Sequence, residues 1–428
     1  MNGTVLTQTT LQDDAGAPHI DGVPHENIGT FADVKASAPE SDLAGQARRF
    51  PWAALLVMAL MGFLLIATET MPAGLLPQIA SGLNVTEGTA GQFVSAYALG
   101  TVIAAMPAIA ATRGLRRKPV FIVGILGFLA ANLITVFSTD IVLSLGARLL
   151  AGAFSGLLWG MLAGYARRIT APEHAGRALA VASLGTPVGL AVGTPFGAWL
   201  GTALDWRWSF GVLSVLTIVA VLLAAILVPD APGQRAETRV PLVRVFGIPG
   251  VAVVLAVIVS WMLGHNILYT YIGSYLRTAG LQLSVDVALV TFGAAAIAGI
   301  ALTGAVIDKG LRRLVLLSLS VFLVAGAIFI VGHMSLVAVL VAIVLWGIAF
   351  GGAAAQLQTA ISAASGENAD VANAMLGVAF NLAIFAAGVA GAVAISYFDG
   401  LVLPAALVGL AAVALFFAIS GRRTAFPR

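Results

Sequence analysis

Long apolar runs separated by short polar segments fill the chain from about residue 50 onward. Each run has about 20 residues, the length that crosses the hydrocarbon core of a bilayer as a helix. Helices also satisfy their own backbone polar groups in lipid. The pattern predicts an all-α membrane protein with twelve spanning helices near residues 52–78, 88–111, 118–137, 140–166, 176–202, 207–228, 250–275, 287–307, 314–332, 335–360, 372–397 and 401–420.

The polar segments divide the chain into parts. Residues 1–49 carry scattered Asp, Glu, Gly and Pro without hydrophobic periodicity, which predicts a disordered tail. The first apolar run is of full spanning length, so we do not expect a signal peptide. We expect a six-helix bundle over 50–228, a linker over 229–248, a second six-helix bundle over 249–420 and a short tail over 421–428.

Composition supports a lipid-facing surface. The 428 residues are 60% hydrophobic and 10% charged, with a mean hydropathy of +1.00, whereas soluble domains carry about 25% charged residues. Cysteine is absent, which excludes disulfides, thiolate metal sites and a cysteine nucleophile. The basic residues form short clusters between apolar runs and not one patch, so we predict no nucleic-acid partner. We also expect no cofactor and no metal.

The distribution of basic residues predicts the orientation. With the N-terminus inside, 19 of the 22 Lys and Arg fall on the inner side, and only Arg207 and Arg277 fall outside. Arg148 alone lies within a span. Because cytoplasmic loops carry an excess of Lys and Arg, this predicts a multi-pass protein of the cytoplasmic (inner) membrane with both termini in the cytoplasm.

Two basic stretches, 112–117 and 308–313, lie 196 residues apart, each between two apolar runs. A repeat of about half the chain predicts two copies of one unit, an architecture of transporters. The stretches resemble the signature loop of the major facilitator superfamily, although Thr112 replaces the usual Asp in the first copy. The resemblance implies a conformational latch, and the alternative is a set of simple positive-inside anchors. The candidate latch residues are Arg113, Arg116, Arg117, Asp308, Lys309, Arg312 and Arg313.

Three ionisable residues within spans are functional candidates, because charges in lipid are costly. Glu69 and Arg148 lie at similar depths, roughly 10 and 12 Å below the outer ends of their helices. A carboxyl alone in an apolar cavity favours its neutral form, and a nearby guanidinium favours its charged form. His265 lies 196 residues after Glu69, the spacing of the two loops. These three are predicted to couple protons. The alternatives are that Glu69 lies at the wet outer mouth while Arg148 merely bonds backbone carbonyls, and that a neighbouring helix satisfies His265.

Uncharged polar side chains also gather on the spans. Some will join helices by hydrogen bonds, and others are expected to line a substrate cavity. The cavity candidates are Asn266, Tyr269, Tyr271, Gln356, Tyr97 and Asn381.

The span near 176–202 carries Gly193, Pro195, Gly197 and Gly201. Gly at four-residue spacing allows close helix approach, and Pro permits a bend. With the following Asp-Trp-Arg segment, these residues resemble the helix 5–6 region of drug-proton antiporters, especially the arabinose and sugar efflux permease branch. The resemblance implies the major-facilitator fold, a central cavity from helices 1, 4, 7 and 10, and a role for Arg148 in proton transfer.

These patterns together predict a proton-coupled antiporter that exports a small neutral or weakly cationic solute, such as a drug-like compound or a sugar. Its partners would be the lipid bilayer, the solute and protons, and we expect a monomer. An importer or passive carrier of the same fold remains open, as does a receptor or scaffold without transport. We do not expect an enzyme, because no nucleophile–base pair or metal-spaced ligand set stands out.

Overall fold

A computed structural model describes residues 50–112, 114–233, 247–248, 250–366 and 369–426. The predicted tail over 1–49, most of the predicted linker and Arg113 lie outside these ranges.

The first half of the described chain begins with a broken helix. Pro72 lies at the start of a tight 3-10 turn, η1, which separates two α-helical pieces of one span. Asp140 and Asp205 accept backbone hydrogen bonds at the starts of two later helices, as helix caps do. The helices are α2 (Trp52–Thr70), η1 (Met71–Leu75), α3 (Leu76–Leu83), α4 (Glu87–Thr112), α5 (Arg117–Phe137), α6 (Ile141–Arg168), η2 (Pro172–His174), α7 (Ala175–Ser183), α8 (Gly185–Val188), η3 (Gly189–Gly193), α9 (Thr194–Ala203) and α10 (Trp206–Leu227).

The second half follows a similar plan. Its helices are α12 (Val251–Thr270), α13 (Ile272–Thr278), α14 (Val285–Val331), α15 (Leu336–Gly351), α16 (Ala353–Ser365), α17 (Ala369–Tyr397), η5 (Gly400–Val402), α18 (Leu403–Ser420) and η6 (Gly421–Arg423).

Helix α14 contains two predicted spans. Its 47 residues would extend about 70 Å, more than twice the hydrocarbon thickness. Only Gly310 leaves the helical backbone region inside it. The expected loop over 308–313 was therefore too long: the residues around Gly310 are good helix formers, and a single glycine suffices for the turn. The described ranges contain eleven helices long and apolar enough to cross a membrane, and dividing α14 at Gly310 makes twelve spans.

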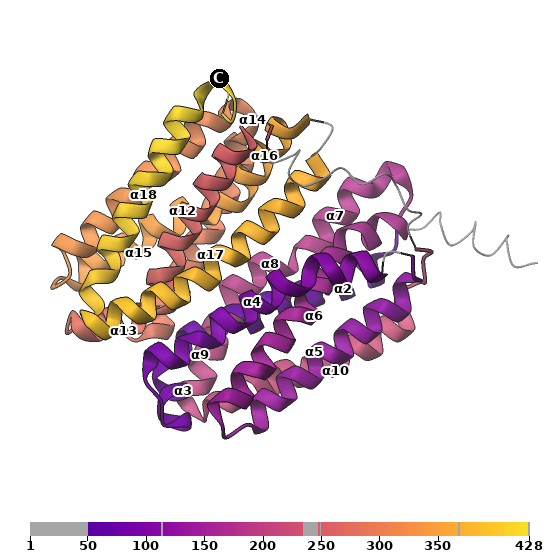
Figure 1. Cartoon of the computed structure of the whole chain (residues 1–428), viewed down its shortest axis with the longest axis horizontal. Coiled ribbons are helices and arrows are strands. Elements are labelled where there is room, and N and C mark those ends of the chain that lie inside the picture. Colours follow the sequence, from indigo (N-terminus) through magenta and orange to yellow (C-terminus); the bar gives the residue numbers. More distant parts are fainter. Residues whose placement is uncertain (1–49, 113, 234–246, 249, 367–368, 427–428) are drawn as a thin grey trace, which may run out of the picture. The chain divides into compact units, whose positions relative to one another are not determined.

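The spans form two six-helix halves with matching internal packing (Figure 1). In the first half α4 packs on α6, and in the second half α14 packs on α15. Glycines make both contacts close: Gly100 and Gly152 meet backbone of the facing helix in one pair, and Gly299 and Gly351 do so in the other. The duplication predicted from the two basic stretches is thus visible as two equivalent helix pairs.

The halves meet along α4 and α17, which lie side by side (Figure 1). We call the helix ends near Arg116 and Arg312 the basic face, and the opposite ends the far face. The Gln92 side chain donates to the Gly388 carbonyl over 3.2 Å, close to the far face. Arg277 and Glu87 form an ion pair at the far face itself. These contacts hold the two halves together on the side away from the basic loops.

A stripe of glycines joins the span of α7–α9 to the first span. Glycine recurs every fourth residue from Gly185 to Gly201, and these positions face α2 and η1. The structure places Gly193 against Ala67, Gly197 against Met71 and Gly201 against Leu75. Between Gly189 and Gly193 the helix widens into a π-turn, a form that is frequent at functional sites.

Replacing Gly193 with Leu should disturb this packing. A Cβ atom there would lie 2.8 Å from the Ala67 Cβ, and overpacking costs about 1–3 kcal/mol. We expect a lower melting temperature and reduced transport. Gly164→Leu is the control, because nothing lies within 4 Å of its added Cβ. Equal effects of both variants would show that the helix contact is not tight.

Candidate transport site

Arg148 is the most deeply placed charge that the structure describes. It lies on α6 and is fully buried. Its Nη2 donates to the Thr68 carbonyl over 2.8 Å, and its Nε donates to the Phe93 carbonyl over 3.2 Å. Arg148 therefore joins three helices, α2, α4 and α6, through main-chain acceptors whose positions do not depend on side-chain rotamers.

Aromatic rings complete the surroundings of Arg148. Its Cζ lies 4.6 Å from the centre of the Tyr97 ring and 5.3 Å from that of Phe210. Such distances allow cation–π attraction, which offsets part of the cost of burying a charge. The Tyr97 hydroxyl donates to the Leu65 carbonyl over 3.1 Å. Tyr97 thus supports the arginine and does not point toward an open space.

Glu69 follows directly after one of the carbonyls that hold Arg148. It lies in the last turn of α2 and is only 6% exposed. The carbonyl of the preceding residue, Thr68, accepts from Arg148, yet the ion pairs among the described residues do not include Glu69. Nη1 of Arg148 is buried and makes no hydrogen bond with a described residue. An acid and a guanidinium donor are thus close, but they are not paired.

Hydroxyl groups connect this site to the second half. The Thr70 and Thr194 hydroxyls lie 2.6 Å apart and share a hydrogen bond between α2 and α9. The Tyr269 hydroxyl, from α12, lies beside Thr194. A polar cluster from three helices therefore begins one residue after Glu69 and spans the boundary between the halves.

His265 lies in a different environment from Glu69. Its Nδ1 accepts a hydrogen bond of 3.0 Å from the Trp346 indole. Its ring stacks on Phe350 with centres 3.5 Å apart, and Tyr269 and Phe292 lie within 5.5 Å. These contacts lie in the second half, between α12, α14 and α15. They match the alternative in which a neighbouring helix satisfies the histidine.

The other cavity candidates make local or interhelical hydrogen bonds. The Gln356 amide donates to the Thr303 and Ser318 hydroxyls and joins α16 to both parts of α14. The Asn266 and Asn381 amides each donate to a carbonyl of their own helix, four residues earlier. The Tyr271 hydroxyl donates to the Gly388 carbonyl over 2.7 Å, beside the contact between α4 and α17. These hydrogen bonds do not join the four side chains to one another.

The second basic stretch has few contacts in this structure. Asp308, Lys309 and Arg313 are exposed. Arg312 donates to the Phe426 carbonyl over 3.3 Å and so ties the stretch to the C-terminal segment. Its link is therefore within the second half.

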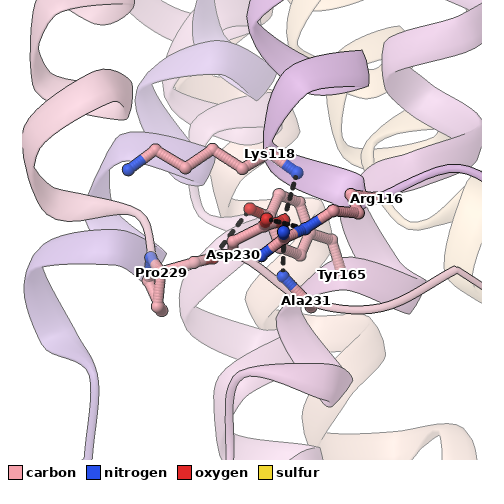
Figure 2. Close-up of polar contacts among 6 residues, drawn as sticks. All are labelled: Arg116, Lys118, Tyr165, Pro229, Asp230 and Ala231. Carbon is pink, nitrogen blue, oxygen red and sulfur yellow. Dashed lines mark hydrogen bonds and ion pairs between the residues drawn. The ribbon is translucent and has the colours of Figure 1, made fainter.

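The first basic stretch is bound to the end of the first half. Figure 2 shows Asp230, just after α10, between the loop and helix α5. Its Oδ2 pairs with the Arg116 Nε over 2.5 Å. Its Oδ1 accepts from the backbone N–H groups of Lys118 at 3.1 Å and Ala231 at 2.8 Å. The first loop lacks its usual Asp at Thr112, and Asp230 brings a carboxylate to it from another helix.

Neighbouring contacts fix the same segment. The Ala231 carbonyl accepts from the Arg117 N–H over 2.9 Å, and the Tyr165 hydroxyl donates to the Pro229 carbonyl over 2.8 Å (Figure 2). Asp230 and Ala231 together satisfy two N–H groups in the first turn of α5, which would otherwise lack partners. We call residues 229–231 with these contacts the Asp230 clamp.

The Asp230 clamp should be insensitive to pH in the physiological range. Partial burial disfavours its charged form, but two backbone N–H donors and Arg116 outweigh this and hold the pKa of Asp230 below its usual value of 3.8. A depressed folded pKa gives stability that is present above the unfolded pKa and is lost as pH falls through the folded one.

Asp230→Ala should therefore lower stability by about 1 kcal/mol, as for the loss of a helix cap. Thermal unfolding of the purified protein should show the same deficit from pH 5 to 8 and a smaller deficit below the usual pKa of Asp230. Asp140→Ala, which removes a cap at the far face, is the control for a general cap effect. A deficit that changes between pH 6 and 8 would contradict the account.

Two membrane-spanning halves, with a buried arginine inside the first, are typical of a multi-pass membrane transporter. A family model of the Major Facilitator Superfamily matches residues 58–388. The chain belongs to this family, whose members are transporters and not enzymes.

Relatives are named for several functions. The "Probable sugar efflux transporter" of Helicobacter pylori is 24% identical over 81% of this chain and 90% of that protein. A chloramphenicol efflux pump of Mycobacterium tuberculosis is 28% identical over 85% and 90%. A transcription regulatory protein, OpdE, of Pseudomonas aeruginosa is 30% identical over 69% and 75%.

A solved structure shares the fold. The crystal structure of a peptide transporter, POT, in complex with alafosfalin matches with a TM-score of 0.71. The match covers 90% of this chain and 97% of that one at 12% sequence identity. Together with the family match, it confirms the predicted fold class. The two relatives named for efflux confirm the resemblance to the efflux branch.

Sequence reasoning missed several residues around the site. Phe93 and Thr68 hold Arg148 through carbonyls, which any residue could supply, so no sequence signal exists for them. Trp346 lies in an apolar run whose pattern does not show which side faces His265. Asp230 could have been noticed, because it follows a predicted span on the same side as the loop that lacks its acid.

Proposed function

We propose that the protein is a proton-coupled antiporter that exports a small neutral or weakly cationic solute across the cytoplasmic membrane. One observation carries the proposal: Glu69 is buried beside Arg148, yet the two do not form an ion pair. An ionisable acid inside the membrane is a functional candidate by default. Protonation of Glu69 changes the charge of the site by one unit.

The chemistry of the cycle follows from the free donor of Arg148. When Glu69 is ionised, Nη1 of Arg148, which makes no hydrogen bond with a described residue, can pair with it. When Glu69 is protonated, Arg148 stays on the Thr68 and Phe93 carbonyls. Because Glu69 lies just before the turn η1 and beside the hydroxyls that reach α12, this exchange alters the boundary between the halves.

We assign the basic face to the cytoplasm, on the positive-inside rule. The contacts of α4 with α17 and α13, Gln92 to Gly388 and Glu87 to Arg277, then lie on the outer side, as expected for a state open to the cytoplasm. A substrate would enter from that side and contact aromatic and aliphatic groups, with few fixed charges. Sugars and chloramphenicol, named for two relatives, are neutral polar solutes of this kind.

A second candidate is a membrane regulator without transport. The relative named as a transcription regulatory protein favours it. The two candidates differ in whether a solute moves.

Accumulation assays test the proposal. Cells that express the protein should hold less chloramphenicol than cells with Glu69→Gln, and the difference should vanish when a protonophore collapses the proton gradient. Equal accumulation for a panel of sugars and antibiotics, with normal protein levels in the membrane, would favour the regulator. An increase in accumulation on expression would favour an importer of the same fold.

A further inference from the structure

A recess lies at the boundary of the halves, away from Arg148. It has a volume of about 340 Å³ and lies between the span of α7–α9 and helix α14. Its lining comprises Val192, Pro195, Phe196 and Trp199 from the first half, and Asp286 and Val290 from the second. The lining is largely apolar, with one carboxylate.

Asp286 has no partner in the described part of the chain. It lies in the first turn of α14 and is half-buried. The ion pairs and side-chain hydrogen bonds among described residues do not include it, and Arg277, nearby in sequence, is already paired with Glu87. A carboxylate in the first turn interacts favourably with the helix dipole, and no cationic side chain among the described residues pairs with Asp286.

Two aromatic rings border the same recess. Phe196 and Trp199 have ring centres 5.8 Å apart and are about half exposed, at 49% and 53%. Aromatic faces attract cations, most strongly where water is scarce. Apolar walls, two aromatic faces and one unpaired carboxylate suit an apolar molecule with a single positive charge. A neutral molecule would leave the carboxylate unpaired, and an anion would be repelled.

The recess adjoins the candidate transport site through one helix segment. Pro195 and Val192 line the recess, while Thr194 between them is fully buried and contacts Thr70. The π-turn of Gly189–Gly193 lies in the same segment. On the α14 side, Gly293 packs closely against Ala191: a Cβ atom at Gly293 would lie 3.0 Å from the Ala191 Cα. Small residues therefore allow the two halves to approach closely there.

We propose that this recess binds lipophilic monocations at the boundary between the halves. The site is separate from Glu69 and Arg148, and its existence does not require transport. Asp286 supplies the charge and the aromatic rings supply the apolar and cation–π contacts. A phospholipid with an ethanolamine head is the competing occupant, and displacement by a lipophilic cation distinguishes it from the proposed ligand.

The binding test uses tritiated tetraphenylphosphonium and the full chain in phosphatidylcholine nanodiscs. Asp286→Asn should weaken binding about five- to tenfold, the size expected for losing one charge contact at a half-exposed site. Asp286→Glu should stay within about threefold. Asp399→Asn is the matched control, because it removes an exposed far-face carboxylate yet can still cap the following turn. Glu69→Gln should leave the Asp286-dependent binding in place.

The location test uses an azidophenyl derivative of triphenylphosphonium and mass spectrometry of the labelled peptides. Adducts should fall on residues 191–199 and 285–290 and should decrease in Asp286→Asn. Equal binding by the Asp286→Asn and Asp399→Asn variants would overturn the proposal. Adducts elsewhere, or a co-purified ethanolamine lipid that the cation does not displace, would overturn it as well. If the protein bound the cation in an Asp286-dependent way but transported no solute, the proposed function would be wrong and the proposed binding site would stand.

Discussion

Arg148→Met is expected to reduce proton-driven transport about 100-fold or more while the protein still folds. In the proposed cycle the guanidinium pairs with ionised Glu69, and a charge-assisted interaction made only at that step contributes about 3 kcal/mol, which corresponds to about 100-fold in rate. Removing the charge also removes its desolvation cost of several kcal/mol. The free energy of unfolding should therefore change by no more than about 2 kcal/mol.

Two further variants make this prediction specific. Arg148→Lys keeps the charge, but an ammonium cannot reproduce the planar fork that reaches two helices at once, so we expect little recovery of transport. Arg167→Met removes an exposed arginine from the same helix and should transport normally. Transport is measured in proteoliposomes, and folding by thermal unfolding of the purified variants. Normal transport by Arg148→Met would exclude Arg148 from the site.

Glu69→Gln should separate substrate movement from proton movement. Glutamine keeps the size and polarity of the side chain but cannot gain or lose a proton. We expect exchange of labelled for unlabelled substrate to continue. Uphill export driven by a pH gradient should fall about 100-fold or more, because a coupling free energy of about 3 kcal/mol is lost. Glu69→Asp should restore part of the coupled transport.

Glu173→Gln is the control for this variant, since Glu173 is an exposed acid near the basic face. It should not change either measurement. If Glu69→Gln still exported against a gradient at the rate of the unaltered protein, another group would carry the proton.

The broad architecture could be predicted from the sequence because a bilayer imposes strong constraints. A span needs about 20 apolar residues whatever its neighbours are, so the runs and their lengths sufficed for twelve helices. Gly310 shows the limit: a polar stretch predicts a loop, yet one residue with a non-helical backbone turns the chain. Backbone geometry at that scale depends on packing and not on hydropathy.

Side-chain partners were harder to predict for a related reason. Helices in lipid are apolar around their whole circumference, so periodicity does not show which side meets a neighbour. The repeat spacing predicts equivalent positions for His265 and Glu69 in the two halves, but it does not predict the contacts of His265 with Trp346 and Phe350. Arg148 was easier, because a charge within a span must face the protein interior. Its main-chain hydrogen-bond partners nevertheless could not be predicted, because any residue supplies a carbonyl.

Proton movement during substrate flux tests the central claim most directly. The purified protein is placed in liposomes that contain a pH-sensitive dye, and substrate is added on the outside without an imposed proton gradient. The account predicts a pH change in the lumen that follows substrate flux and is absent in Glu69→Gln. Substrate flux without any pH change in the lumen would contradict it.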